Sequence, residues 1–422
     1  MNIQQWKQRL LSADCREQLT TLYGNDDPTR YLTILEDYQK TFGDSNAIRL
    51  FSAPGRVELC GNHTDHQGGQ VVALAVDLDI IGAASARDDG VIRLVSYGTE
   101  PCTVNLNEEC PSVGTSDALI WGVAKSLEDK GYAVGGFDCV TRSAVPFGSG
   151  LSSSAAFENF VATVLGGLYN DQPISPVDKA LCGQWAENTC FGKPCGLMDQ
   201  LASCVGDVSY IDFADATHPK VCQVAMPLSE LGLVLCVVKT GGSHADLTHH
   251  YAAIPAEMKQ IAAYFGKTVL SECEKQQVMD NLPQLREKAG DRAVLRALNY
   301  FDECERSRKV LAALQAGDVA GVLPLLTASG NGSHTLLQNV NNPEDPSFDG
   351  VGMALYVSRQ ICPTGTYRVH GGGFGGTMLG IVPKESFAQY KEQIETVFGK
   401  DSCIPLRVRP CGGVEIEVKS EK

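Results

Sequence analysis

The sequence lacks the features that mark disulfide-stabilised, zinc-binding and membrane-spanning proteins. Its 16 cysteines form no C-x-x-C pair and no Cys/His pair with the spacing of a structural zinc site. No stretch approaches the length of about 18 apolar residues that a membrane span needs, and the first residues, MNIQQWKQRL, lack the apolar core of a signal peptide. We therefore expect a cytoplasmic protein whose free cysteines serve as small buried apolar side chains.

Runs of basic residues are also missing. The chain has 35 Lys and Arg against 50 Asp and Glu, which gives a net charge of −15. Because nucleic acids and anionic membranes attract basic surfaces, we expect neither as a partner. If such a protein handles an anionic substrate, its positive potential must be local and come from a few basic side chains, glycine-rich backbone or a metal ion. Several of the 43 glycines do lie in clusters.

No internal repeat and no low-complexity linker divides the chain, although 422 residues are too many for one ordinary hydrophobic core. We expect two lobes with a broad interface, the N-terminal lobe over residues 1–215 and the C-terminal lobe over 216–422. The last strand can return to the first lobe.

The hydrophobic pattern predicts a mixed α/β chain. Leucines recur at helical spacing in the first 45 residues, and short β-branched runs separated by Gly and Pro begin at Ile48. Charge-rich helical sequence fills most of 251–316. Strands are predicted at 92–98, 103–106, 136–144, 231–240 and 377–382, and helices at 117–130, 176–188 and 385–398, before a last strand, VEIEVK.

A turn rich in glycine and serine joins a predicted strand to an amphipathic helix. It reads Val145-Pro-Phe-Gly-Ser-Gly-Leu-Ser-Ser-Ser-Ala-Ala. The free N–H groups and the positive dipole end of a helix N-terminus bind phosphate. The turn is not a Walker A loop, because no G-K-[ST] follows the glycines. Taken alone, it is also consistent with an ordinary glycine turn that has a serine N-cap.

Three further segments narrow the interpretation. Ala53-Pro-Gly-Arg-Val with Gly61-Asn-His-Thr-Asp65, and Pro194-Cys-Gly-Leu-Met-Asp-Gln200, resemble signatures of the galactokinase family. The serine-rich turn and His370-Gly-Gly-Gly-Phe-Gly-Gly376 are similar to motifs of the wider superfamily of galactokinase, homoserine, mevalonate and phosphomevalonate kinases, the GHMP kinases. The chain is therefore identified as a divergent member of the galactokinase family.

The resemblance implies a two-lobed α+β fold of the GHMP-kinase type, with the active site in the cleft between the lobes. It implies ATP and Mg²⁺ as cofactors and a small-molecule sugar as substrate. The γ-phosphoryl group of ATP would pass to the anomeric hydroxyl of galactose or a galactose-like hexose. Such a transfer needs positioning, charge neutralisation and removal of the acceptor's proton.

The resemblance also assigns roles to individual residues. Asp199 matches the catalytic carboxylate that serves as the base, and Arg56 matches the arginine beside it. The expected ATP-binding residues are Gly148, Ser149, Gly150, Leu151, Ser152, Ser153 and Ser154, and the expected Mg²⁺ ligands are Ser154 and Glu187. The sugar is expected to contact Asn62, His63, Asp65, the backbone of Gly196, and Tyr251. The simpler alternatives are a helix-capping Asp, a surface Arg and a solvated helical Glu.

The sugar side departs from the family's pattern. Asn62 stands where the family has Glu, and a neutral amide is a weaker acceptor than a carboxylate. We therefore expect weaker binding of galactose, or a pocket suited to another substituent. Other departures are Glu58, Cys60, His66 and Gln67 in place of Asn, Ile, Tyr and Asn, Ser243 in place of Arg, and His370 in place of Thr.

These departures leave alternatives open. One is a catalytically weak paralog that senses sugar and ATP and acts through a protein partner, and another is a kinase for a different sugar such as an N-acetylhexosamine. The uninterrupted serines before Ala155 favour an active enzyme. A non-sugar alcohol such as homoserine or mevalonate is disfavoured by the G-x-H-T-D and P-C-G-L-M-D-Q segments.

Overall fold

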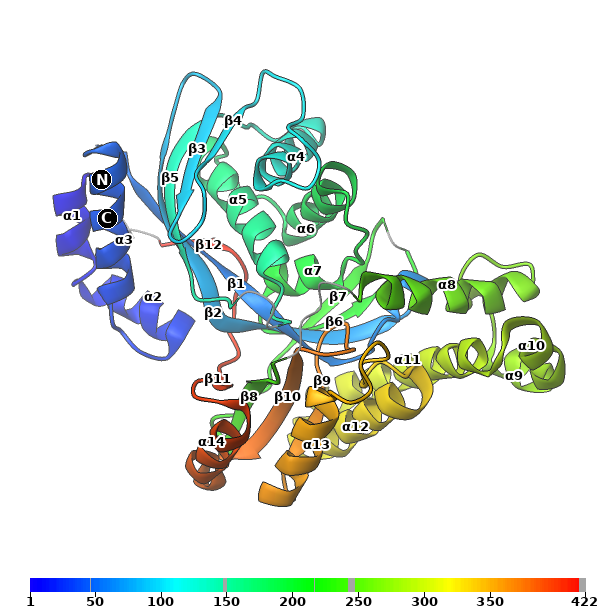
Figure 1. Ribbon diagram of the computed structural model, residues 1–422. Coiled ribbons are helices and arrows are strands. Elements are labelled where there is room, and N and C mark those ends of the chain that lie inside the picture. The colour runs from blue at the N-terminus through cyan, green and yellow to red at the C-terminus, as the bar shows by residue number, and fades with distance from the viewer. Residues whose placement is uncertain (46, 147–149, 216, 242–246, 417–422) are drawn as a thin grey trace.

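Two β-sheets organise the chain. The computed structural model describes residues 1–45, 47–146, 150–215, 217–241 and 247–416 (Figure 1). The larger sheet has eight strands in the order β12-β1-β2-β5-β3-β4, with β6 paired to β2 and β7 paired to β6. Its strands are β1 (Arg49–Cys60), β2 (Gln70–Ala86), β3 (Val91–Ser96), β4 (Cys102–Asn105), β5 (Phe137–Ser143), β6 (Val208–Asp212), β7 (Lys220–Val224) and β12 (Val414–Glu415).

The smaller sheet has four antiparallel strands in the order β11-β8-β10-β9. They are β8 (Leu233–Lys239), β9 (Thr366–Val369), β10 (Thr377–Pro383) and β11 (Cys403–Leu406). The loop between β9 and β10 carries the glycine-rich segment after His370.

Helices cover both faces of the larger sheet (Figure 1). The strands alternate between two apolar cores, because successive side chains of a strand point to opposite faces. On β1, Leu50 packs in the core of the N-terminal helices, whereas Phe51 packs in the core beneath α5. The helices are α1 (Ile3–Arg9), α2 (Ala13–Tyr23) and α3 (Thr29–Phe42) on the first face, and α4 (Ser116–Asp129), α5 (Ser153–Tyr169), α6 (Pro176–Trp185) and α7 (Met198–Val205) on the second.

The last three helices pack against the smaller sheet, whereas the helical region 248–315 contacts the larger sheet and extends to one side of the molecule (Figure 1). The helices of both groups are α8 (Thr248–Tyr264), α9 (Lys275–Asp280), α10 (Leu282–Ala289), α11 (Asp291–Gln315), α12 (Val319–Gly332), α13 (Gly350–Ile361) and α14 (Lys384–Phe398). Four short helical turns, η1 (Asp65–Gln67), η2 (Ala186–Phe191), η3 (Leu270–Glu272) and η4 (Ser333–Leu337), connect longer elements.

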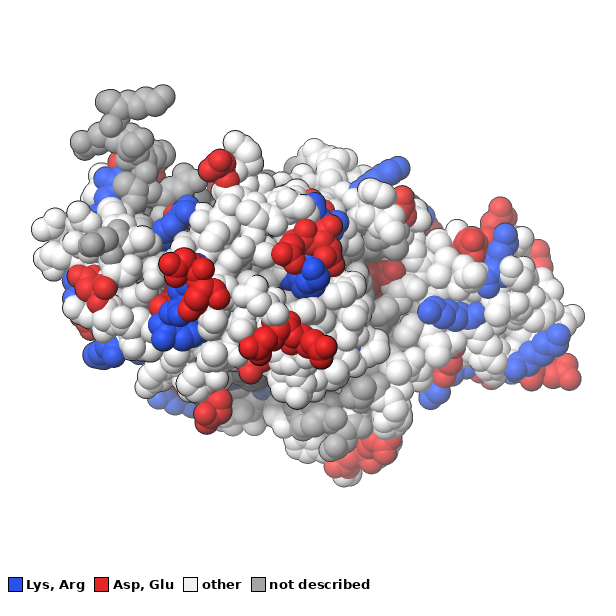
Figure 2. All heavy atoms as spheres, turned by 90° about the horizontal axis from the view of Figure 1, so that it is seen from above, with Lys and Arg blue, Asp and Glu red and all other residues white. Residues whose placement is uncertain are grey.

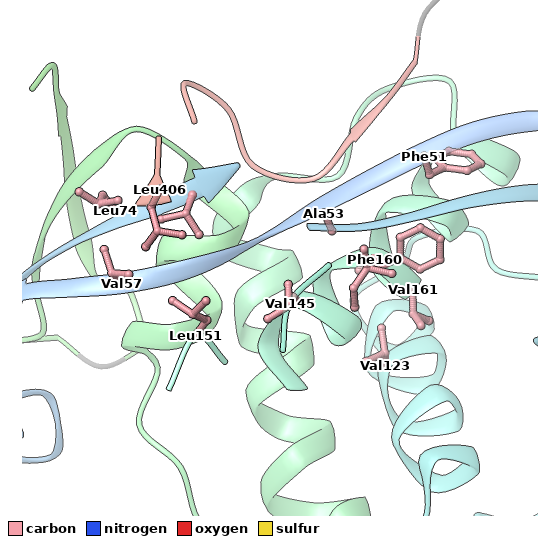
Figure 3. Close-up of a cluster of buried hydrophobic side chains, with 14 of the residues drawn as sticks. Phe51, Ala53, Val57, Leu74, Val123, Val145, Leu151, Phe160, Val161 and Leu406 are labelled. Carbon is pink, nitrogen blue, oxygen red and sulfur yellow. The ribbon is translucent and has the colours of Figure 1, made fainter. Parts of the chain in front are cut away.

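The main apolar core crosses from one sheet to the other. Figure 3 shows Val57 and Leu74 of the larger sheet beside Leu406 of the smaller one. The same core contains Leu151 from the serine-rich turn and Phe160 from α5. The predicted phosphate loop is therefore anchored in the part of the core that joins the two sheets.

The mixed α/β prediction is confirmed, and most predicted elements lie within a few residues of the observed ones. One helix differs: residues 176–188 form α6 only as far as Trp185 and then continue as the wider π-helical turn η2. The predicted last strand is represented by β12, which pairs with β1, and residues 417–422 lie outside the described part. Because β7 and β12 also belong to the larger sheet, the division at residue 215 stays a prediction.

The surface carries both charges side by side. On the face shown in Figure 2, the protruding end built from α9, α10 and the start of α11 has basic and acidic side chains as neighbours. The same helices carry the ion pairs Arg286–Asp291 and Lys275–Asp302. Within the described ranges, no helix has the length and apolar character needed to cross a membrane. All sixteen cysteines are free thiols.

Candidate active site

A cavity of about 210 Å³ lies where the serine-rich turn meets the glycine-rich loop after β9. The turn and Arg56 come from elements of the larger sheet, whereas the glycine-rich loop follows a strand of the smaller one. The cavity is lined by Arg56, Pro146, residues 150–154, Lys193, Tyr251 and residues 370–372. Segments that are far apart in the sequence thus form one hollow between the lobes.

Asp199 and Arg56 form a two-point ion pair at this cavity. Arg56 Nε lies 2.8 Å from Asp199 Oδ1, and Nη2 lies 2.5 Å from Oδ2. The guanidinium is buried, with 4% of Arg56 exposed, whereas the Asp199 side chain keeps about a third of its surface accessible. The paired geometry fixes the carboxylate's orientation, because the planar guanidinium matches both oxygens.

Arg56 also ties the serine-rich turn to β1. Its backbone N–H donates to the carbonyl of Leu151 at 3.1 Å, and its Nη1 donates to the carbonyl of Gly150. The hydroxyl of Ser152 donates to Asp199 Oδ2. The structure therefore places Asp199 directly against the turn. Ser152 has a φ of 54°, a left-handed conformation that is strained for a non-glycine residue, as is common at functional sites.

The environment keeps Asp199 ionised. Burial alone would raise the pKa of this carboxyl group, but the Arg56 charge and the hydrogen bonds from Arg56 and Ser152 outweigh burial and lower the pKa below its ordinary value. Lys193, which also lines the cavity, acts in the same direction.

The start of α5 also lines the cavity. Ser153 and Ser154 open the helix, and its first N–H groups have no acceptor within the helix. Together with the helix dipole they form a site suited to phosphate oxygens. Gly148 and Ser149, which were also predicted to bind ATP, lie outside the described residues.

Two buried glutamates, Glu187 and Glu158, form a second acidic group beside the cavity. Glu187 on η2 is buried, and its two oxygens lie 3.0 Å from Lys193 Nζ and 2.9 Å from Gln200 Nε2. The same Gln200 nitrogen contacts the buried Glu158 at 3.0 Å. Burial and the neighbouring Glu187 raise the pKa of Glu158 well above its ordinary value.

This acidic group has the chemistry of a cation site. Among the described residues, Glu158 Oε1 and Gln200 Oε1 are buried without a hydrogen-bond partner. Oxygen atoms are the ligands that Mg²⁺ prefers, and unused oxygens next to two carboxylates fit such an ion.

The predicted sugar-binding residues lie around the glycine-rich loop and the start of α7. His63 Nε2 lies 3.0 Å from the carbonyl oxygen of Gly372, and burial lowers the His63 pKa to about 4. Tyr251 donates to the carbonyl of Gly373 at 2.9 Å. The backbone of Gly196 approaches the Asp65 carboxylate so closely that a Cβ there would lie 1.8 Å from Oδ2, so a larger residue would displace this carboxylate.

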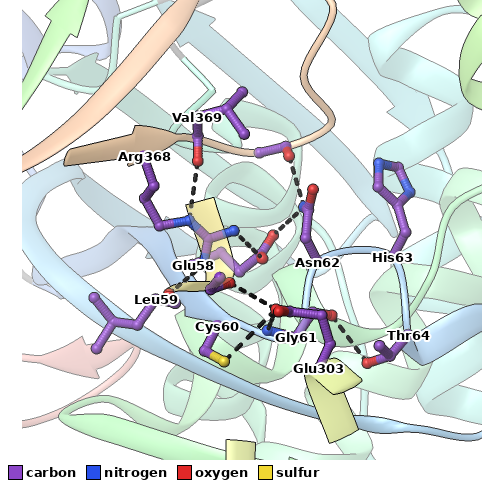
Figure 4. A network of polar contacts seen from close by, with 12 residues as sticks. Glu58, Leu59, Cys60, Gly61, Asn62, His63, Thr64, Glu303, Arg368 and Val369 are labelled. Atoms are coloured by element: carbon purple, nitrogen blue, oxygen red, sulfur yellow. Dashed lines mark hydrogen bonds and ion pairs between the residues drawn. The ribbon is translucent and has the colours of Figure 1, made fainter. Parts of the chain in front are cut away.

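Asn62, which is also predicted to contact the sugar, is a buried side chain. It is 2% exposed, and its Nδ2 lies 2.8 Å from Glu58 and 2.9 Å from the carbonyl of Gly371. Its oxygen accepts from Asn339 at 2.7 Å. Figure 4 shows the Asn62 amide between Glu58 and the glycine-rich loop, with His63 beside it. Both ends of the amide are thus bound to protein groups, and a direct contact of Asn62 with the sugar stays a prediction.

Glu58 in turn pairs with Arg368 in the interior. Both side chains are 1% exposed, and Arg368 Nη2 lies 3.2 Å from Glu58 Oε1 (Figure 4). The register of β1 with β2 shifts on both sides of this stretch, between Pro54 and Arg56 and again after Glu58. Between the two shifts the pairing is regular, so Arg56 and Glu58, two residues apart, point to the same side of the sheet.

His370 is a buried histidine that also lines the cavity. It is 2% exposed and lies next to Gly150. Burial, with the charges of Arg56 and Arg368, lowers its pKa from 6.5 to about 3, so the imidazole is neutral at pH 7.

The stability of the fold should therefore fall below pH 6.5 through His370. The unfolded chain binds a proton at His370 below pH 6.5 and the folded chain does not, so stability is full above 6.5 and is lost as the pH falls toward 3. Between pH 7.5 and 5.0 we expect the wild type to lose about 2 kcal/mol more than His370→Gln, measured by urea unfolding at both pH values. The exposed His218 serves as control, because His218→Gln should leave the pH dependence unchanged. Equal losses in wild type and His370→Gln would contradict this assignment.

Several side chains at the site had no assigned role in the sequence interpretation. Lys193 precedes Asp199 by six residues, in the same segment, but a single lysine has no distinguishing pattern. Glu158 follows Ser154 by four residues, so helical spacing could have placed the two on one face of α5. Arg368 carried no signal, because its partner Glu58 lies 310 residues away in the sequence.

A fold of two α/β lobes, a helix N-terminus facing a carboxylate–arginine pair and a glycine-rich loop closing the cavity define a small-molecule kinase of the GHMP type. Comparisons with known proteins agree. Residues 36–86 match the galactokinase galactose-binding signature, and residues 118–207 match the GHMP kinases N terminal domain. The chain is 30% identical over 371 residues to a galactokinase of Streptomyces coelicolor, with 87% of this chain and 92% of that protein covered.

Solved structures show the same fold. The Lactococcus lactis galactokinase complexed with galactose matches with a TM-score of 0.77 and 21% identity, covering 92% of this chain and all of that one. The Methanococcus jannaschii mevalonate kinase matches with a TM-score of 0.58 and 16% identity, covering 86% and 99%. The chain belongs to the galactokinase family, which makes it a phosphotransferase with an alcohol as acceptor.

Proposed function

We propose that the protein is an ATP-dependent sugar 1-kinase that transfers the γ-phosphoryl group of ATP to the anomeric hydroxyl of galactose. The observation that carries the proposal is the Asp199–Arg56 pair. It is bonded to the serine-rich turn and lies at the cavity that the glycine-rich loop closes. The relatives' names point to the same substrate.

Different residues bind the phosphates, stabilise the transferring group and remove the proton. The start of α5 and the ammonium of Lys193 hold phosphate oxygens, and Arg56 stabilises the charge on the transferring group. Asp199 accepts the proton of the sugar hydroxyl. Since its pKa lies below the ordinary value, it is a weak base, and the proton leaves late, when the new P–O bond has already made the hydroxyl acidic.

The sugar would lie between His63, Asp65, the Gly196 backbone and Tyr251, all of which lie beside the glycine-rich loop or the start of α7. We propose that Asn62 shapes this pocket through its bonds to Glu58 and the glycine-rich loop.

Mg²⁺ would be held by Ser154 and Glu187, with Glu158 as a further oxygen donor. Bound there with ATP, the ion would supply positive charge to the phosphate oxygens. The free thiols of all sixteen cysteines support the proposal that the protein works in the cytoplasm, where thiols remain reduced.

The test is an ADP-release assay with Mg-ATP across a panel of hexoses that includes galactose, glucose, 2-deoxygalactose and N-acetylgalactosamine. We expect galactose to give the highest kcat/KM and the product to be the 1-phosphate, identified by its ³¹P–¹H coupling. ATP binding that depends on sugar but yields no ADP would refute the kinase proposal, and a preference for the N-acetylated sugar would refute galactose as substrate.

A further inference from the structure

Three metal-ligating side chains converge at the N-terminus of α8, outside the cavity described above. The Nε2 atoms of His249 and His250 lie 3.1 Å and 2.7 Å from the same oxygen, Glu344 Oε1. One ligand atom from each of the three side chains lies within 4.8 Å of the others. We propose that this cluster binds a divalent transition-metal ion of the Zn²⁺ type, at a site separate from the one for Mg-ATP.

The spacing of the ligand atoms suits such an ion. In a tetrahedral zinc site the metal lies about 2.0–2.1 Å from imidazole nitrogens and carboxylate oxygens, so neighbouring ligand atoms are about 3.3 Å apart. The two nitrogen–oxygen distances lie close to that value, and the three ligand atoms all lie within 4.8 Å of one another. Two imidazoles and one carboxylate favour Zn²⁺ over Mg²⁺ or Ca²⁺, which prefer oxygen ligands throughout.

The cluster is held by packing as well as by its own hydrogen bonds. The His250 side chain is 17% exposed and lies against the ring of Phe374, with centroids 5.5 Å apart. The two imidazole rings lie 4.0 Å apart at a tilt of 39°. His249 and Glu344 remain more than half exposed, so an ion reaches them directly from solvent.

A hollow beside His250 provides room for a fourth ligand. Its volume is about 380 Å³, and His334 and Asn341 are among the residues that line it. Arg292 and Arg296 line it too, but both guanidinium groups are paired with Glu257, at 3.0 Å and 2.9 Å. The fourth position is therefore open to water or to His334, as in zinc sites that bind a small ligand.

A metal ion bound to His249 and His250 would affect the active site through Tyr251, which follows His250 in the sequence and lines the cavity. Tyr251 donates to the glycine-rich loop at Gly373 and meets Phe374 edge to face, with centroids 5.4 Å apart. An ion that joins the start of α8 to Glu344 would hold Tyr251 and Phe374 in place. Metal binding should therefore raise the melting temperature of the nucleotide-free protein.

The experiment is a titration of metal-free, nucleotide-free protein with Zn²⁺, followed by calorimetry, and with Co²⁺, followed by visible absorption. We expect one equivalent of Zn²⁺ to bind, and Co²⁺ to give the d–d bands of a tetrahedral site without the thiolate band that cysteine ligands would produce. His250→Ala and Glu344→Gln should each weaken binding at least tenfold and abolish the rise in melting temperature.

Two controls separate this site from others. His218→Ala removes an exposed histidine elsewhere and should bind like the wild type. Glu187→Gln alters the proposed Mg²⁺ ligand and should also leave this binding unchanged. Because Glu344 is exposed, Glu344→Gln remains a test even if His250→Ala fails to fold. No stoichiometric binding, a thiolate band, or wild-type affinity in both ligand variants would overturn the proposal.

Discussion

Replacing Asp199 by Asn is expected to lower kcat by a factor of about 10²–10⁴ while the protein remains folded. The amide keeps the size of the side chain and can still contact Arg56 and Ser152, but it cannot take the proton of the sugar hydroxyl. It also leaves the buried Arg56 charge without its counter-charge. Steady-state ADP release at saturating ATP and galactose measures the effect, and the Kd for ATP should change far less than kcat.

The matched control for this variant is Asp37→Asn. Asp37 also accepts from an arginine, with Arg142 Nε at 2.6 Å, but the pair joins α3 to β5 on the far face of the sheet. Asp37→Asn should therefore show wild-type kcat. The wild-type kcat should also stay flat from pH 8 to 5, because the pKa of Asp199 lies below its ordinary value. An Asp199→Asn enzyme with near-normal turnover would refute the role of this carboxylate as base.

The helices and strands could be predicted where the hydrophobic pattern of a short segment is typical of one of them. The β-branched runs of β1 and β2 and the helical spacing in α5 reflect the burial of their side chains, which a sequence window detects. The turn η2 was not predicted, because a π-helical turn has no hydrophobic period of its own. It differs from an α-helix only in that its hydrogen bonds span five residues instead of four. Yet this turn carries Glu187, so the element that the pattern missed is one that positions a candidate ligand.

The site could be predicted where a short segment carries the whole feature. The serine-rich turn and the segment around Asp199 are of this kind, and the structure brings them into hydrogen-bond contact. Asn62 is the opposite case. Its contact with the sugar stays a prediction, and its amide oxygen accepts from Asn339, 277 residues further along the chain. A contact at that separation depends on how the lobes pack, which no local pattern contains.

The second large effect is expected for the buried pair behind the cavity. Arg368→Met should destabilise the fold by about 3–5 kcal/mol, because it leaves the carboxylate of Glu58 in the interior without its arginine. Burial already raises the pKa of Glu58, and Arg368 is the main group that counteracts it. Since one apolar core crosses both sheets, urea unfolding followed by circular dichroism reports the loss.

The pH dependence and a double variant separate this cause from simple loss of packing. Without Arg368, the Glu58 pKa rises further above the unfolded value of 4.5, so stability is retained below pH 4.5 and is lost as the pH rises through the folded-state pKa. The deficit of Arg368→Met should therefore be larger at pH 8 than at pH 5, and Arg368→Met/Glu58→Gln should recover part of it. Arg286→Met, which breaks the exposed pair with Asp291, should destabilise the fold far less, because solvent screens an exposed ion pair. If Arg368→Met cost no more than this control, or if Glu58→Gln brought no recovery, the buried charge of Glu58 would not be the reason that the fold needs Arg368.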